Sequence, residues 1–374
     1  MLLSLGGGSL SQADNPAGQS YTWQVDDSLS RLAEKYYDDP AAWPAIVSAT
    51  NARVEGDERF ARILSPGGIQ VGQLLWLPEP AQMDQLLAQS PHLQPLTADR
   101  LAEFEQYIDS ARLRYQIPGA VVVLVRGHEI VWAKGFGERE LGQPEPVDPE
   151  TVFAVGSTTK AMTSMLVASL VDDGLLEWDQ PVQEIWPDFT LSDPTRAAQL
   201  RVRDMFTMAT GLPRRDLVWS GADLTAEQLM ESLAELPVYG EVGQWYNYNN
   251  QVVSTGGYVA ALAAGGVYGQ LRQAYMDQLR QRIFEPIGMQ SATTAVEQVL
   301  ANPNHATPHD YNLYGEVSPT HFHPSDSITP AGGVYANGLD LARFVLTQMN
   351  GGLTPEGRRV VSARNLAETH RPYI

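Results

Sequence analysis

The stretch Val155-Gly-Ser-Thr-Thr-Lys160 places a hydroxyl and an amine three residues apart at the start of a long apolar run. Residues 157–173 have the spacing of a helix that Gly174 ends, so Ser157 and Lys160 lie one turn apart on one face. A serine hydroxyl is a weak nucleophile unless a base takes its proton, and a lysine whose pKa is lowered can be that base. The helix N-terminus adds N–H donors where an oxyanion would form. The stretch therefore predicts the nucleophile Ser157 with Lys160 as its base.

A structural interpretation of the same residues stays open, because serine is a preferred N-cap and a helical lysine is commonly solvated. A second pattern favours the chemical interpretation. Tyr248-Asn-Asn250 follows Ser157 by 91 residues, in a polar and aromatic stretch. Tyrosine can relay protons, and the amide of Asn250 can hold a substrate amide. Tyr335-Ala-Asn337 also matches this pattern, so the flanking residues must decide between the two.

Composition excludes several classes of protein. The chain has 374 residues, 43% of them hydrophobic, a formal charge of −19 and no cysteine. Two domains are expected from this length. The negative charge disfavours binding to nucleic acids and to anionic membranes. The lack of cysteine excludes disulfides, thiolate metal sites and cysteine nucleophiles. No apolar run approaches the length of a membrane span, and no Lys or Arg precedes Arg31, so a signal peptide is not evident.

The N-terminal part predicts a flexible leader followed by a small module. The leader covers residues 1–20, of which residues 5–20 hold too few apolar side chains to pack. A strand over 21–25, helices over 29–36 and 41–51, and a returning strand over 73–77 follow from the hydrophobic spacing. The predicted order is strand, helix, helix, strand.

Residues 21–80 resemble a LysM domain, the module that binds peptidoglycan and chitin. The resemblance is carried by Tyr21-Thr-Trp-Gln-Val, Asp27-Ser-Leu-Ser-Arg-Leu-Ala, Tyr36-Tyr-Asp-Asp-Pro, Trp43-Pro and Val71-Gly-Gln-Leu-Leu-Trp-Leu-Pro78. Asp26 stands where the family usually has glycine, and the loop 52–70 is long. The resemblance implies a shallow groove for N-acetylated glycans, lined by Asp27, Ser28, Leu29, Ile69 and Gly72. Capping and packing alone would also account for the aspartate and the serine.

A proline-rich linker over 81–96 leads to a second module over 97–374. An amphipathic helix is expected near 99–115, and the apolar strand 119–125 and the strand 130–135 predict an antiparallel hairpin. The fold class expected for the chain is α+β: a βααβ module, then a domain of antiparallel sheet with a helical region.

The second module resembles the serine beta-lactamase-related family of class C beta-lactamases, D-Ala-D-Ala carboxypeptidases, D-aminopeptidases and esterases. The resemblance is carried by Gly135-Phe-Gly, Val155-Gly-Ser-Thr-Thr-Lys160, Leu170-Val-Asp-Asp-Gly-Leu-Leu, Val202-Arg-Asp-Met-Phe-Thr-Met-Ala-Thr-Gly-Leu-Pro213, Tyr246-Asn-Tyr-Asn-Asn250 and Pro330-Ala-Gly-Gly-Val-Tyr-Ala-Asn-Gly-Leu-Asp-Leu-Ala-Arg-Phe344. It implies that Ser157 is acylated, Lys160 is its base, Tyr248 transfers a second proton and Asn250 contacts the substrate. No cofactor is implied.

The third motif of that family is absent from residues 1–374. This motif, Lys- or His-Thr/Ser-Gly, supplies a group for the substrate and the second oxyanion N–H. The chain is therefore expected to be a fragment that lacks the end of its catalytic domain. A genuinely short form would instead favour a degenerate binding protein.

Metal chemistry has weaker support. His305, His309, His321 and His323 cluster with Asp310 and Asp326 in one polar stretch. The stretch is rich in Pro and Asn, and His128-Glu129 lacks the second histidine of a zinc motif, so a surface loop is expected and no metal site. A Ser-His-Asp hydrolase is compatible with the composition, but the Gly-x-Ser-x-Gly elbow that holds the nucleophile in many such enzymes does not occur in this sequence.

Two hypotheses for the function remain. The first is a serine hydrolase of the cell envelope, extracellular or periplasmic, that the LysM module holds on peptidoglycan or a chitin-type glycan. It would cleave an amide, a lactam or an ester, with peptidoglycan-type peptides and beta-lactams as candidates. The alternative is a non-catalytic peptidoglycan-binding protein with an inactive second module.

Overall fold

The chain divides into two compact units, Met1–Glu105 and Gln106–Ile374. The computed structural model describes residues 18–24, 27–64, 69–90, 96–220, 223–322 and 326–373. Most of the expected leader, residues 91–95 of the linker and His323 lie outside the described residues.

The first unit has the predicted order of strand, helix, helix and strand. Its elements are β1 (Gln19–Thr22), α1 (Leu29–Tyr37), the 3-10 turn η1 (Pro40–Ala42), α2 (Trp43–Arg53), β2 (Leu74–Leu77), η3 (Pro80–Gln82) and α3 (Met83–Gln89). β1 and β2 pair antiparallel, with Tyr21 opposite Leu75. α1 begins after its N-cap Ser28, which accepts a bond from Arg31 N, and ends where Asp38 turns left-handed (φ 57°). The sequence predicted both ends of this helix, the start from Asp27 or Ser28 as a cap and the end from Asp38-Asp39-Pro40.

The prediction of a strand over 21–25 was wrong in its bounds. β1 ends at Thr22, and Trp23 follows it directly and is buried in the core of this unit. Trp23 N donates to Gln73 O, and Trp23 O accepts from Gly72 N. The alternation itself continues past the end of the strand, because Thr22 and Gln24 are exposed while Tyr21 is half-buried and Trp23 is buried.

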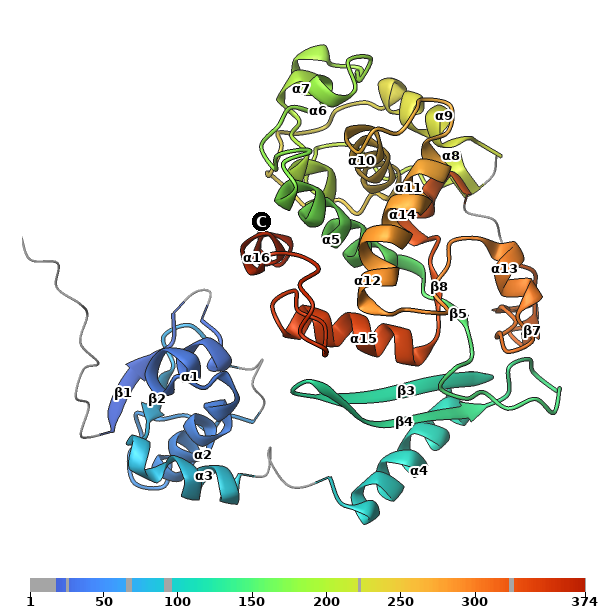
Figure 1. Cartoon of the computed structure of the whole chain (residues 1–374). Coiled ribbons are helices and arrows are strands. Elements are labelled where there is room, and N and C mark those ends of the chain that lie inside the picture. The colour runs from blue at the N-terminus through green and yellow to red at the C-terminus, as the bar shows by residue number, and fades with distance from the viewer. Residues whose placement is uncertain are drawn as a thin grey trace, which may run out of the picture. The chain divides into compact units, whose positions relative to one another are not determined.

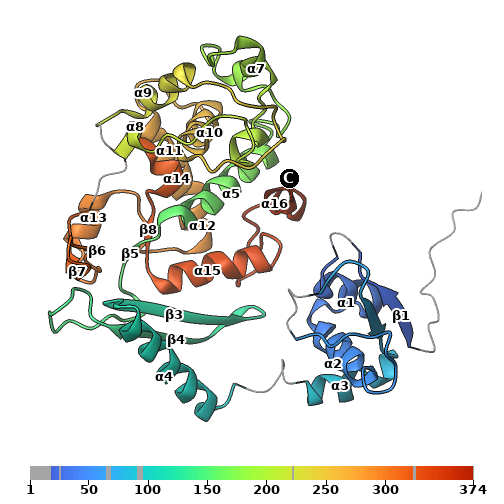
Figure 2. The same ribbon diagram turned by 180° about the vertical axis from the view of Figure 1, so that it is seen from behind.

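The second unit opens on a helix and a hairpin. α4 (Ala98–Arg114) spans the division between the units, and β3 (Gly119–Arg126) pairs antiparallel with β4 (Glu129–Gly137). α15 (Gly338–Met349) and α4 lie on opposite sides of this hairpin (Figures 1 and 2). Within the described residues, the strands form only two-stranded antiparallel sheets.

The helical part of the second unit is built around two buried helices, α5 (Thr159–Asp172) and α10 (Asn250–Ala263). Their apolar side chains share one core. The other elements are β5 (Phe153–Ala154), η5 (Gly156–Thr158), α6 (Val182–Ile185), α7 (Pro194–Gln199), η6 (Arg203–Phe206), α8 (Leu217–Ser220), α9 (Ala226–Glu231), η7 (Ser232–Glu235), α11 (Leu271–Leu279), the π-helical turn η8 (Arg280–Phe284), α12 (Glu285–Ile287), α13 (Val296–Ala301), β6 (His309–Tyr311), β7 (Val317–Pro319), η9 (Asp326–Ile328), α14 (Thr329–Gly332), β8 (Tyr335–Ala336) and α16 (Ala363–Thr369).

Close packing of α10 yields a first prediction, Gly257→Ala. A Cβ at Gly257 would lie 2.5 Å from Cβ of Pro330 and 3.2 Å from Cγ2 of Thr163. Helix propensity alone would stabilise an alanine here by about 0.5–1 kcal/mol, whereas overpacking a core costs about 1–3 kcal/mol. We expect a net loss of about 1 kcal/mol in the free energy of unfolding, measured in urea. An increase in stability would contradict the close packing of Gly257 against Pro330.

Candidate active site

Ser157 lies in the middle of η5, the 3-10 turn that leads into α5. The expected helix 157–173 therefore begins two residues late, at Thr159. β5 pairs with β8 just before this turn, and Val155 N donates to Val334 O over 3.0 Å. Gly156 has a φ of +52°, a left-handed conformation that favours glycine. This backbone leaves the Ser157 side chain exposed at the surface.

All four predicted side chains belong to one hydrogen-bonded group: two of them contact the Ser157 oxygen, and the fourth contacts Lys160. Lys160 Nζ donates to Ser157 Oγ over 3.0 Å, as the three-residue spacing predicts. The Tyr248 hydroxyl lies 2.6 Å from the same Oγ. Asn250 accepts from Lys160 Nζ through Oδ1 over 2.8 Å. Residues 90 and 91 positions apart in the chain thus form one hydrogen-bonded group.

The Lys160 ammonium has a third acceptor, which was not predicted. Nζ donates to the main-chain oxygen of Ala331 over 2.7 Å, so the acceptors come from η5, α10 and α14. An ammonium has three N–H donors, and these three acceptors can use all of them. The amine is therefore held in one position beside Ser157.

Burial lowers the pKa of Lys160 below its ordinary value. Hydrogen bonding and charge from Tyr248 and the charge of Asp216 oppose this shift, and the charge of Arg214 adds to it. Burial raises the pKa of Tyr248, but the bonds from Lys160 and Ser157, with the charges of Lys160 and Arg214, outweigh burial and lower it overall. Both groups are thus shifted towards the range in which they can exchange protons.

Loop contacts explain why Tyr248 reaches the nucleophile. Asn249 is the N-cap of α10, since its Oδ1 accepts from Val252 N, and its Nδ2 donates to Pro213 O. Asn247 Nδ2 donates to Leu212 O over 2.8 Å. The residues on both sides of Tyr248 are therefore tied to Leu212 and Pro213, which holds the Tyr248 hydroxyl beside Ser157.

Sequence reasoning missed three other groups. The Ala331 carbonyl had no side-chain signal, because any residue carries that atom. Asp216 Oδ1 accepts from Asn250 Nδ2 over 3.2 Å, and Asp216 Oδ2 accepts from Arg214 Nε over 2.5 Å. The charged triplet Arg214-Arg-Asp216 directly after the quoted Gly-Leu-Pro stretch was the available signal.

In the first unit, the five residues predicted to bind glycan lie at the start of α1 (Asp27, Ser28 and Leu29) and in the loop before β2 (Ile69 and Gly72), and Gly72 N donates to Trp23 O. Asp27 accepts from the Tyr21 hydroxyl and from Gln24 N, and Ser28 caps α1, so both have structural partners. Leu29 is buried, whereas Ile69 is half-buried and Gly72 is exposed. Their role in glycan binding stays a prediction.

The histidine stretch shows ordinary polar contacts. His305 Nδ1 lies 2.6 Å from Asn302 O, and His309 Nε2 accepts from Leu141 N over 3.0 Å. Over the part of the chain that the structure describes, no group of three or more His, Cys, Asp or Glu side chains could hold a metal ion. Over the same residues, no helix combines the length and apolar character that crossing a membrane requires.

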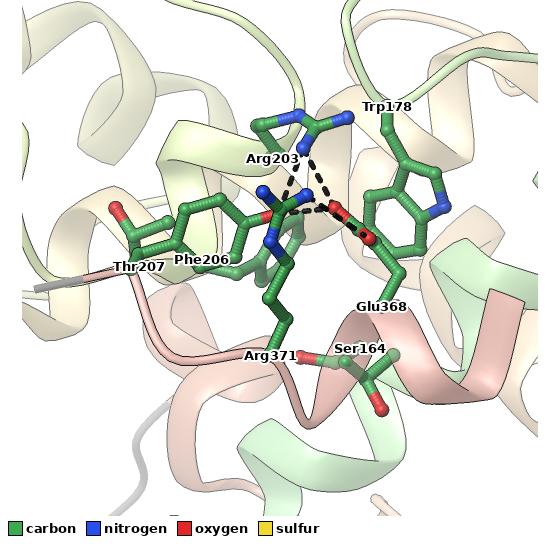
Figure 3. Close-up of a pocket in the computed structure, with 9 residues that line it drawn as sticks. Ser164, Trp178, Arg203, Phe206, Thr207, Glu368 and Arg371 are labelled. Atoms are coloured by element: carbon green, nitrogen blue, oxygen red, sulfur yellow. Dashed lines mark hydrogen bonds and ion pairs between the residues drawn. The ribbon is translucent and has the colours of Figure 1, made fainter. Parts of the chain in front are cut away.

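A separate cavity of about 170 Å³ lies beside α16. Figure 3 shows Arg203 and Glu368 directed towards each other in it, joined over 2.6 Å. Arg203 also bonds the Tyr373 hydroxyl and pairs with Asp179. These partners tie the segment after α16 to η6, so the charged groups of this cavity have a structural use.

Comparison with known proteins shows the family of this chain. Residues 87–372 match the family described as Beta-lactamase. The match covers most of the chain, which therefore belongs to the beta-lactamase family. The predicted beta-lactamase-like α+β fold is confirmed for this part, while the LysM resemblance stays a prediction.

Particular relatives are hydrolases and penicillin-binding proteins. The chain is 28% identical over 296 residues to the unguisins hydrolase of Aspergillus campestris, with 75% of this chain and 53% of that protein covered. It is 26% identical over 272 residues to penicillin-binding protein 4 of Amycolatopsis lactamdurans, covering 71% and 68%. The chain spans about half the length of the unguisins hydrolases of A. campestris (53%) and Aspergillus violaceofuscus (45%).

Solved structures show the same fold. The octameric penicillin-binding protein homologue from Pyrococcus abyssi aligns with a TM-score of 0.61 at 23% identity, covering 73% of this chain and 60% of that one. The D-amino acid amidase from Ochrobactrum anthropi aligns with a TM-score of 0.57 at 22% identity, covering 70% and 71%. These likenesses concern the fold alone.

Proposed function

We propose that the chain is a serine hydrolase that forms an acyl-enzyme on Ser157. The contact of Ser157 Oγ with both Lys160 Nζ and the Tyr248 hydroxyl carries this proposal. An exposed hydroxyl between a lysine of lowered pKa and a tyrosine of lowered pKa has a proton acceptor and a proton relay in place. The hydrolases among the relatives support the same class of reaction.

In the proposed reaction, Ser157 Oγ attacks the carbonyl carbon of an amide, a lactam or an ester. Its proton passes to neutral Lys160, directly or through the Tyr248 hydroxyl. The bond to the leaving nitrogen or oxygen then breaks, and the leaving atom takes a proton from the same pair. Water next attacks the acyl ester, gives up a proton to the pair and releases the acid, which restores Ser157.

Amides and lactams are the substrates we propose first. One relative is called a D-amino acid amidase, another a D-alanine carboxypeptidase and a third a penicillin-binding protein. The amides, peptides and penicillins to which these names refer all contain a carbonyl group that a serine nucleophile can attack. Peptidoglycan-type peptides and beta-lactams therefore come before simple esters in a substrate screen.

Labelling of the whole chain tests the proposal. The protein is incubated with a fluorescent penicillin and, separately, with an aryl ester, and the intact mass and the labelled peptide are then determined. We expect one acyl group per chain, carried by the peptide that contains Ser157. A label on another residue, or no reaction with either compound, would refute the acyl-enzyme proposal.

We propose further that the first unit binds N-acetylated glycans and holds the protein in the cell envelope. The backbone bond from Gly72 to Trp23 supports this, together with Val71 next to Gly72, which is 64% exposed despite its apolar side chain. A sugar ring can cover an exposed apolar side chain of this kind.

Sedimentation of the full chain with purified peptidoglycan tests this second proposal. We expect Val71→Glu to reduce the bound fraction, because the charge would have to be desolvated against the glycan. Ala41→Glu adds the same charge at another exposed position of this unit and serves as the matched control. Equal binding of both variants, or no binding by the parent protein, would remove the glycan site. Binding without acylation would support the non-catalytic alternative.

A further inference from the structure

The short helix α14 supplies the Ala331 carbonyl that Lys160 contacts, and α5 also binds α14 at the preceding carbonyl. Thr163 Oγ1 donates to Pro330 O over 2.7 Å, and Lys160 Nζ donates to Ala331 O over 2.7 Å. Lys160 and Thr163 are three residues apart on α5 and therefore lie on one face of it. Two neighbouring carbonyl groups of α14 are thus held by one face of α5.

A buried tyrosine completes this contact. Thr163 Oγ1 carries one proton and has two carbonyls within reach, Pro330 O at 2.7 Å and Thr159 O at 3.1 Å. The Tyr275 hydroxyl lies 2.8 Å from the same Oγ1. Since Thr163 gives its proton to the nearer carbonyl, the bond between the two hydroxyls is donated by Tyr275. Tyr275 is fully buried in α11, and burial raises its pKa, so its hydroxyl retains that proton.

Close packing leaves these groups no room to shift. Thr163 and Pro330 are both buried, and α10 lies against them at Gly257. A Cβ at Gly257 would lie 2.5 Å from Cβ of Pro330 and 3.2 Å from Cγ2 of Thr163. In an interior packed this closely, a change at one group must displace its neighbours. The bonds from Tyr275 through Thr163 to Pro330 therefore fix the backbone one residue away from the carbonyl that Lys160 uses.

We propose that Thr163 and Tyr275 are positioning residues, which hold the backbone of α14 so that one of its carbonyls fixes Lys160 Nζ. This inference rests on the proposed role of Lys160 as the base and deepens it. Both hydroxyls act through the backbone of α14, so neither residue is catalytic. The other titratable or charged groups that act on Lys160 come from outside α11 and α14: Tyr248, Asp216 and Arg214.

Titration of Lys160 itself tests the proposal on the full chain without a substrate. The chain has three lysines, Lys35, Lys134 and Lys160, so isotope-labelled lysine gives three Cε signals in the NMR spectrum, and Lys160→Met identifies one of them. The Lys160 ammonium donates to Ala331 O, and a hydrogen bond to the charged form raises a lysine pKa. Loss of this bond inside a buried site should therefore lower the midpoint of Lys160.

Thr163→Val replaces the hydroxyl with a methyl group of similar size. A carbon atom needs about 3.3–3.6 Å from a carbonyl oxygen, whereas Oγ1 lies 2.7 Å from Pro330 O, so α14 must move away. We expect the Lys160 midpoint to fall by about one pH unit, the loss typical of one hydrogen bond to a charged group. Acylation of Ser157 above the midpoint should slow about tenfold for the same reason. Tyr275→Phe should give smaller changes, because Thr163 keeps its hydroxyl, and Thr163→Ser should behave like the parent protein.

Thr347→Val on α15 is the matched control. Thr347 is also fully buried, and its hydroxyl donates to a carbonyl of its own helix, Arg343 O, over 2.9 Å. This variant should leave the Lys160 midpoint unchanged, and urea unfolding shows whether each variant is folded. A shift as large as that of Thr163→Val would mean that any disturbance of the core alters Lys160, which would overturn the proposal.

Other outcomes separate this proposal from the proposed function. An unchanged midpoint in Thr163→Val, or a rise towards the ordinary lysine value through entry of water, would refute the positioning of Lys160. If Thr163→Val does not fold, Tyr275→Phe, which keeps the ring and loses one oxygen, provides the same test. If the midpoint falls as expected but Ser157 of the parent protein is not acylated, the positioning stands and the proposed function fails.

Discussion

Ser157→Ala is expected to abolish covalent labelling of the chain by a penicillin or an ester probe. The substitution removes the oxygen that both Lys160 and Tyr248 contact, and no other atom takes its place between them. Ser157 is exposed, so the loss of its side chain leaves the core intact and the unfolding midpoint close to that of the parent protein. Intact mass before and after incubation gives the result directly.

Thr158→Ala is the matched control for this experiment. Thr158 is the adjacent exposed hydroxyl, and its side chain does not cap α5. We expect this variant to be labelled like the parent protein. Labelling that persists in Ser157→Ala would show that another residue is the nucleophile.

Lys160→Met is expected to slow acylation of Ser157 by about a thousandfold, within the range that general acid–base catalysis contributes. Methionine retains much of the apolar length of lysine but cannot take a proton. Lys134→Met, a change of the same kind on β4, should react at the parent rate. The measurement is the rate of probe incorporation at saturating probe.

The pH dependence of the parent protein provides a second test of Lys160. The amine acts as a base only when it is neutral, so the acylation rate should rise with pH through the pKa that governs Lys160. Burial lowers that pKa, and the midpoint should therefore lie below the ordinary lysine value of about 10.4. A midpoint at or above this value, or equal loss of activity in both lysine variants, would argue against Lys160 as the base.

Local patterns in the sequence predicted much of the fold. The apolar runs and their turn residues gave the β3–β4 hairpin, whose strands extend by one or two residues beyond the expected 119–125 and 130–135. The three-residue spacing predicted the contact between Ser157 and Lys160, because that contact lies within one turn. The structure brings Tyr248 and Asn250 to the same place, while their catalytic roles stay predictions.

Interactions that depend on tertiary folding were beyond the sequence. The Ala331 carbonyl reaches Lys160 only because α14 packs on α5, and a main-chain atom leaves no residue-type signal. Met208 has a left-handed backbone (φ 57°), and its main-chain oxygen accepts a bond from Asn247 N. No residue type in the sequence indicates this conformation. Asp216 was visible as a charge, but its two partners are set by how the loop before α8 folds against α10.

The proposed acylation of Ser157 would depend on the conformation of the chain, because three acceptors from separate segments hold Lys160 Nζ. Ser157, Asn250 and Ala331 come from segments as much as 171 positions apart from Lys160 along the chain. Detachment of any one segment, even with the secondary structure retained, would free the amine to become solvated and raise its pKa. The intensity of an acylating dye would then report the native fraction of the second unit, in a lysate as well as in a purified sample.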